Sequence, residues 1–206
     1  MARHIRTNTN LNTSKRAMSD ILHPGTGIIF MKVGTHAKET LEVIIARKTE
    51  EIENAGFAFW GYGGNTCHPQ TMVHPFARTY EQRGETVFLC MEEMESTHRG
   101  EPVRADEFSI DGTTWHPIPN AINALGSRFA LVIRALRRQQ LNLSLENTLV
   151  AVGDKRGRPG NQYIGGRVDK ACLKILRASE STDQITPIRL VAELYPPYAV
   201  LLRNRA

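Results

Sequence analysis

The chain is organised around one stretch, FAFWGYGGNTCHPQTMVHPF, which runs from Phe57 to Phe76. It begins with closely spaced aromatic residues, which are typical of a strand, breaks at a group of glycines, and then runs into an expected loop that carries Asn65, Cys67, His68 and His74. Glycines let backbone amides approach a ligand closely, and large rings offer faces on which a flat heterocycle can stack. We therefore predict a ligand-binding site in this stretch. Its expected residues are Trp60, Tyr62, Gly63, Gly64, Asn65 and His68.

The segment before this stretch predicts a strand followed by a helix. The apolar run GIIFMKV, from Gly27, is typical of a strand covered on both faces. A helix over residues 37–55 follows, with Thr35 or a neighbour as its N-cap and Gly56 as its stop. Along this helix the pair Arg47 and Glu51 is four residues apart, which we assign to the exposed side.

The turn VGTHAK lies at the expected N-terminus of that helix. Free amides and the helix dipole favour an anion at such a position. The residues predicted to contact this anion are Lys32, Thr35 and His36. The spacing of a Walker phosphate loop is absent, so an ordinary capped turn remains the alternative.

A second glycine-rich loop, GDKRGRPGNQYIGGR, runs from Gly153 to Arg167. Its composition suits a mobile clamp that grips phosphate with backbone amides and arginine side chains. The alternative is a surface hairpin tip without a ligand. The residues predicted to bind are Arg156, Arg158, Tyr163 and Arg167.

The remaining pattern consists mainly of strands. FSIDGTTWHPI predicts a hairpin whose two-residue turn, Asp111 and Gly112, supplies positive φ angles. VDKACLKILRA, from Val168, is interpreted as a short helix. The fold class that follows is α+β, a mostly antiparallel, strongly curved sheet or small barrel with one long N-terminal helix packed on it. Residues 1–20 are predicted to be a flexible basic arm, and residues 21–206 a single domain.

Composition limits the class of protein. The chain has 206 residues, a net charge of +5 and three cysteines, an odd number that suits a reducing compartment. No apolar run reaches the length of a membrane span, so we predict a cytoplasmic protein without a membrane partner. Eleven basic residues against three acidic ones between Arg128 and Arg177 favour an anionic partner, whereas eight acidic residues against two arginines between Glu85 and Asp111 repel nucleic acid.

Catalytic and metal sites have weaker support. Cys67 and His68 are adjacent and would need a turn to act together as nucleophile and base. A zinc site from Cys67, His68, His74 and His116 lacks the paired spacing of structural zinc motifs. We therefore assign no catalytic residue, no metal and no cofactor.

Three functions remain open. The first is a small-molecule binding protein that captures or sequesters a nucleotide-like, phosphate-bearing ligand, including a cyclic nucleotide signal, by stacking and by its cations. The second is an RNA- or DNA-binding module that uses the basic segment 128–177. The third is a phosphodiesterase or nuclease that uses His68 or His74. A homo-oligomer is compatible with each of them.

Overall fold

The computed structural model describes residues 21–63, 67–96 and 100–205. Strands dominate, and the helices are short. The elements are β1 (Gly27–Val33), α1 (Leu41–Ala55), β2 (Ala58–Gly61), α2 (Gln70–Glu81), β3 (Phe88–Glu93), β4 (Arg104–Ala105), β5 (Glu107–Ser109), β6 (His116–Pro117), β7 (Ala124–Leu125), β8 (Phe129–Leu143), η2 (Leu145–Asn147), β9 (Thr148–Val150), α3 (Gly160–Tyr163), β10 (Lys170–Ile175) and β11 (Thr186–Arg203). The predicted arm, residues 1–20, lies outside the described residues.

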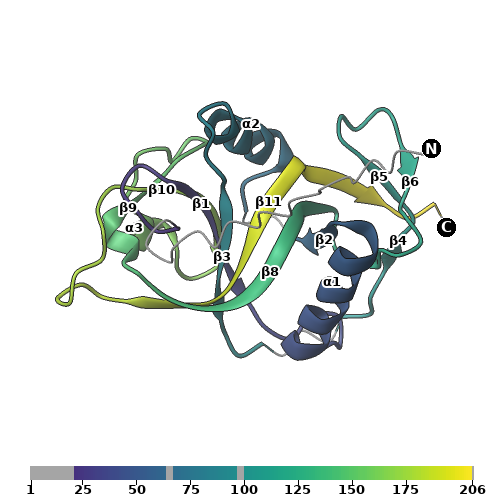
Figure 1. Cartoon of the computed structure of the whole chain (residues 1–206), viewed down its shortest axis with the longest axis horizontal. Coiled ribbons are helices and arrows are strands. Elements are labelled where there is room, and N and C mark those ends of the chain that lie inside the picture. The colour runs from purple at the N-terminus through teal and green to yellow at the C-terminus, as the bar shows by residue number, and fades with distance from the viewer. Residues whose placement is uncertain (1–20, 64–66, 97–99, 206) are drawn as a thin grey trace, which may run out of the picture.

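One large sheet has the strand order β2-β8-β11-β3-β1-β10-β9, and β5 and β6 extend it beside the end of β11. β1 and β3 are parallel, and the other pairs are antiparallel. Figure 1 shows the two longest strands, β8 and β11, running side by side through the molecule, with β9, β10 and α3 at one end and β5 and β6 at the other. These long strands connect the two ends of the fold.

The predicted fold is wrong in its overall shape. The sheet is neither closed nor strongly curled, because its edge strands β2 and β9 pair only with β8 and β10 and never with each other. In the described residues the chain is mostly sheet, and they include no single long N-terminal helix. α1 has 15 residues and α2 has 12.

The start of α1 explains why that helix is shorter than predicted. His36 and Glu39 exchange backbone hydrogen bonds across a tight turn, and the turn's central residues, Ala37 and Lys38, have φ angles of 49° and 66°. A helix cannot pass through left-handed residues, so α1 begins only after Thr40, whose hydroxyl caps Val43 N. At the other end Gly56 stops the helix with φ 81°, as predicted.

Both helices contribute to one core cluster. Ile44 and Ile52 of α1 and Val73 and Phe76 of α2 pack with sheet residues such as Leu131. Figure 1 shows α2 and α1 at separate places along the sheet. No helix in the described part of the chain is long and apolar enough to cross a lipid bilayer.

Three local predictions need correction. The segment from Val168 forms strand β10 rather than a helix, because β1 and β9 pair with it on either side and cover its apolar residues. The second half of the stretch 57–76 belongs to α2 rather than to a loop. The hairpin of β5 and β6 is present, but its turn is longer than two residues, and only Gly112 of the predicted pair has a positive φ.

Candidate functional site

A cavity of about 350 Å³ lies where β1 ends and α1 begins. β2, the segment after β3, the segment 124–130 and the start of β10 complete its walls. Its apolar lining is Met31, Val33, Leu41, Ile44, Phe59, Trp60, Met94, Ala124, Leu125, Ala130 and Leu202. Its polar lining is Lys32, Thr35, His36, Glu39, Arg47, Lys48, Ser96, Ser127, Asp169 and Lys170. The backbone of Gly34, Gly61 and Gly63 fills the remaining wall.

Chain topology brings these walls together. Met31 of β1 pairs with Lys170 of β10, and the backbone N–H of Lys32 donates to Asp169 O at 2.9 Å. β1 and β3 run parallel, so Lys32 lies opposite Glu92, and both strands deliver their carboxyl ends to the cavity. The N-terminus of α1 enters from the same side, and its dipole favours negative charge there.

The cations of the cavity are paired with carboxylates. Lys32 Nζ lies 3.3 Å from Glu92 Oε2, and Lys170 Nζ lies 2.6 Å from Asp169 Oδ2. Asp169 Oδ1 is buried and has no hydrogen-bond partner in the described residues. The cavity therefore offers both ammonium donors for an anion and a carboxylate acceptor for a hydroxyl or amino group.

A largely buried polar network lies between α1 and the segment that precedes β7. Arg47 contacts Glu39 at 2.5 Å and Glu51 at 3.2 Å, and Lys48 contacts Glu51 at 2.7 Å. Arg47 and Lys48 also donate to Asn123 O, and Asn123 N donates to Glu51. Burial lowers the pKa of Lys48 to about 8, although the Glu51 charge opposes this shift. The network ties the segment before β7 to the helix.

This network corrects the assignment of Arg47 and Glu51 to the exposed side of the helix. Glu51 is 2% exposed and accepts hydrogen bonds from Arg47, Lys48 and Asn123. A spacing of four residues places two side chains on one face of a helix, but it does not tell whether that face meets solvent or another segment.

The aromatic residues of β2 are largely core residues. Trp60 is only 4% exposed and packs in the cluster shared by both helices, although it also lines the cavity. Tyr62 is fully buried with its ring 5.5 Å from that of Phe129, and burial raises the pKa of its hydroxyl. Tyr62 does not line the cavity.

The structure brings together only part of the predicted site. Lys32, Thr35, His36, Trp60 and Gly63 line the cavity. Gly64 and Asn65 lie outside the described residues. The residues that sequence reasoning missed are Glu39, Arg47, Lys48, Ser127, Asp169 and Lys170. Asp169 and Lys170 lie just beyond Arg167, the last residue of the basic loop, and no residue of that loop lines the cavity.

His68 and Tyr163 form a separate contact. Their rings stack at 5.6 Å, and His68 Nδ1 accepts a hydrogen bond from the backbone N–H of Cys172 at 3.0 Å. This fixes the neutral tautomer with its proton on Nε2, which lies 3.3 Å from Tyr163 Oη. Burial lowers the pKa of His68. The histidine is thereby built into the packing between α2 and β10.

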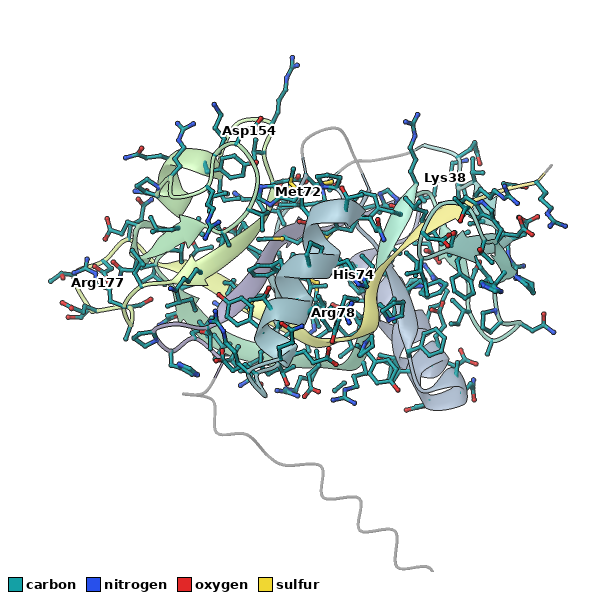
Figure 2. The ribbon with its side chains drawn as sticks, turned by 90° about the horizontal axis from the view of Figure 1, so that it is seen from above. Lys38, Met72, His74, Arg78, Asp154 and Arg177 are labelled. Carbon is teal, nitrogen blue, oxygen red and sulfur yellow. The ribbon has the colours of Figure 1, made fainter. Side chains whose placement is uncertain are left out.

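His74 also contacts the backbone of another segment, at Pro197 of β11. Its Nδ1 lies 2.9 Å from Pro197 O, and its ring meets Tyr198 edge-on at 5.9 Å. Figure 2 shows His74 on α2, beside β11. Neither His68 nor His74 lines the cavity.

The loop from Gly153 to Arg167 is folded on itself. The amides of Val150 and Gly157 bond to Arg158 O and Val150 O at 2.9 and 2.8 Å, and α3 closes the loop. Arg156, Arg158 and Arg167 are exposed. In Figure 2, Asp154 of this loop and Lys38 of the turn before α1 lie on opposite sides of Met72. The tips of the two loops are therefore apart.

Acidic partners neutralise part of the basic segment 128–177. Arg134 and Arg137 of β8 lie 3.1 and 3.8 Å from Glu193, and Arg138 pairs with Glu42 and Glu93. These pairs reduce the positive charge that the segment presents to a nucleic acid.

Among the described residues, no group of three or more His, Cys, Asp or Glu side chains is placed to hold a metal ion. The chain matches no known protein family, and neither the curated proteins nor the solved structures include one with significant similarity to it.

Proposed function

We propose that the protein binds a nucleotide-like, phosphate-bearing small molecule in the cavity between β1, β2 and α1, and that it captures this ligand rather than transforming it. One observation carries the proposal: a single cavity of about 350 Å³ combines Lys32, Arg47 and Lys170 with the apolar surface of Trp60 and its neighbours. Small-molecule sites have this size and this mixture of apolar walls and a few polar groups.

In the proposed complex the phosphate lies near Lys32 and Lys170, beside the N-terminus of α1. Each ammonium group remains beside its carboxylate when the phosphate binds, with Lys32 Nζ 3.3 Å from Glu92 Oε2 and Lys170 Nζ 2.6 Å from Asp169 Oδ2. The phosphate therefore contacts two existing ion pairs instead of two isolated charges. The carboxylate of Asp169, whose Oδ1 has no hydrogen-bond partner in the part of the chain that the structure describes, suits a ribose hydroxyl or a base amino group. Met31, Leu41 and Trp60 then cover the apolar faces of the ligand.

The backbone contacts of the two candidate catalytic histidines, His68 and His74, favour capture of the ligand over its chemical transformation. His68 accepts from a backbone amide, His74 contacts a backbone carbonyl, and both lie outside the cavity lining. Neither side chain is placed to exchange a proton with a ligand in this cavity.

Calorimetry with the four ribonucleoside monophosphates tests the proposal. Lys170→Gln removes a cavity cation, and Lys174→Gln makes the same change at an exposed position on the same strand. We expect Lys170→Gln to weaken binding about tenfold, the value of one charge-assisted hydrogen bond, and Lys174→Gln to leave it unchanged. Thermal unfolding of both variants shows that they remain folded.

Two results would overturn the proposal. The first is that the native protein binds no nucleotide. The second is that both lysine variants weaken binding equally, which would indicate a general attraction for anions instead of a site. Tight, steeply salt-dependent binding of random RNA or DNA would favour the nucleic-acid function, because a polymer releases many counterions.

A further inference from the structure

A second cavity, of about 430 Å³, lies next to the first. Its walls include Ala37, Val103, Gly126, Arg128 and Arg203. Two residues, Ser127 and Leu202, line both cavities. The two spaces are therefore neighbours that share part of their walls.

The wall between the two cavities is thin, since residues that are adjacent in the chain line different cavities. His36 lines the first cavity and Ala37 the second, while Leu125 lines the first and Gly126 the second. A Cβ atom at Gly126 would approach His36 Nε2 to 2.8 Å, and the φ of Gly126 is +69°. Glycine at this position thus leaves room for the imidazole at the boundary.

The wall also carries a hydroxyl donor. Ser127 Oγ accepts a hydrogen bond from Gly63 N at 3.2 Å, which leaves the serine O–H available to donate. A ligand that crosses from one cavity to the other would pass this hydroxyl, because Ser127 lines both spaces.

The second cavity has its own cations. Arg203 donates to Glu107 at 2.6 Å and stacks 4.0 Å from the Trp115 ring centroid, so its guanidinium is held in place. Arg128 is exposed and forms no ion pair with the described residues. A planar guanidinium suits bidentate binding of a phosphate. Both cavities that Ser127 lines therefore offer cations, Lys32 and Lys170 in the first and Arg128 in the second.

We infer that the ligand is a dinucleotide, with one nucleotide in each cavity and its second phosphate at Arg128. This inference rests on the proposed function, since it extends the same site. Each cavity alone is near the lower limit of small-molecule sites, which suits one nucleotide unit, and the shared serine wall suits the linkage between two.

Calorimetry with AMP and GMP, and with linear and cyclic dinucleotides of A and G, tests the inference. We expect the native protein to bind at least one dinucleotide about tenfold or more tightly than either monophosphate, because the second unit binds at high effective concentration. Arg128→Gln should lower dinucleotide affinity about tenfold and leave monophosphate affinity unchanged. Arg189→Gln, which removes an exposed arginine of β11 outside both cavities, should change neither affinity.

The outcomes separate this inference from the proposed function. Equal affinities for mono- and dinucleotides, together with no effect of Arg128→Gln, would overturn the two-cavity ligand and leave nucleotide binding intact. Equal weakening of both ligands by Arg128→Gln would also overturn it, because Arg128 would then act on the first unit. If the native protein binds neither class, the proposed function fails, and the inference fails with it.

Discussion

The backbone amide of Gly63 donates a hydrogen bond to the hydroxyl of Ser127, with 3.2 Å between N and Oγ. Gly61 meets the same serine, since a Cβ atom there would lie 3.1 Å from Ser127 Oγ. Gly61, the last residue of β2, and Gly63 just beyond it thus allow the segment 125–129 to pack against the end of this strand. Their small size serves this close approach of chain segments, which also builds the wall between the cavities.

The first prediction concerns Gly63→Ala. The added methyl group would lie 3.0 Å from the backbone nitrogens of Arg128 and Phe129, which cannot move without disturbing β8. We expect the free energy of unfolding to fall by about 1–3 kcal/mol, as for other overpacked positions. Urea denaturation measures this change.

Ser127→Ala is the comparison for this variant, because it removes the hydrogen bond without adding atoms. It should cost only about 1 kcal/mol. A Gly63→Ala protein as stable as the native one would mean that the two segments do not pack closely.

Sequence patterns predict local backbone features better than they predict which strands pair with each other. The apolar run of β1 and the stop at Gly56 were predicted from short patterns that determine the backbone locally. The strand β10 was missed because an apolar run covered on both sides looks the same in a helix and in a strand. The curved barrel was wrong because hairpin signals do not reveal which strands remain at the sheet edges.

The candidate site shows the same limit. Neighbouring residues in the sequence predict Lys32, His36 and Trp60 as site residues, and all three line one cavity. Lys170 was missed because only the pairing of β10 with β1 brings it there. The glycine-rich loop predicts Arg158 as a site residue, but turn hydrogen bonds fold that loop on itself, and Arg158 does not line the cavity.

The second prediction is a dependence of stability on His68 protonation. Burial lowers the pKa of His68 below its ordinary value of 6.5, and protonation of Nδ1 would displace the Cys172 amide. As pH falls below about 6.5 the unfolded chain binds a proton that the native protein resists, so the free energy of unfolding decreases. NMR titration of the His68 ring gives its pKa directly.

The variant His68→Gln should lose this decrease in stability at acid pH, whereas His23→Gln, at an exposed position, should retain it. A native His68 that titrates at or above its ordinary pKa would contradict the prediction and would restore this residue as a candidate proton donor.

The third prediction concerns the turn before α1. Lys38 has φ 66°, a left-handed conformation that costs a residue with a Cβ atom about 1 kcal/mol or more. Lys38 also pairs with Glu101, but both side chains are largely exposed, so this ion pair contributes little. We expect Lys38→Gly to be about 1 kcal/mol more stable than Lys38→Ala, since both lose the ion pair and only glycine relieves the strain.

Thermal unfolding of the two Lys38 variants measures the difference. Equal stabilities, or a less stable glycine variant, would show that the turn does not hold residue 38 in the left-handed region. Nucleotide titration of the same pair then reports whether the turn positions His36 at the cavity.

The last prediction concerns Lys48, whose ammonium group is buried against Glu51 and Asn123 O. Burial lowers its pKa from the ordinary 10.5 to about 8. Between these values the native amine is neutral while the unfolded chain still binds a proton, so the free energy of unfolding should rise with pH, by about 3 kcal/mol across the whole interval. Urea denaturation at about pH 7 and about pH 10 measures this rise.

Lys48→Met should abolish the rise, because methionine fills a similar volume without a titrating group, and Glu51 keeps its ion pair with Arg47 at 3.2 Å. Lys38→Met, at the exposed turn, serves as the matched control and should rise with pH as the native protein does. If native and Lys48→Met proteins respond to pH in the same way, the amine is solvated rather than buried. Water would then reach the part of the cavity wall that Lys48 forms on α1. The polar network around Asn123 would in that case not hold the segment before β7 in place.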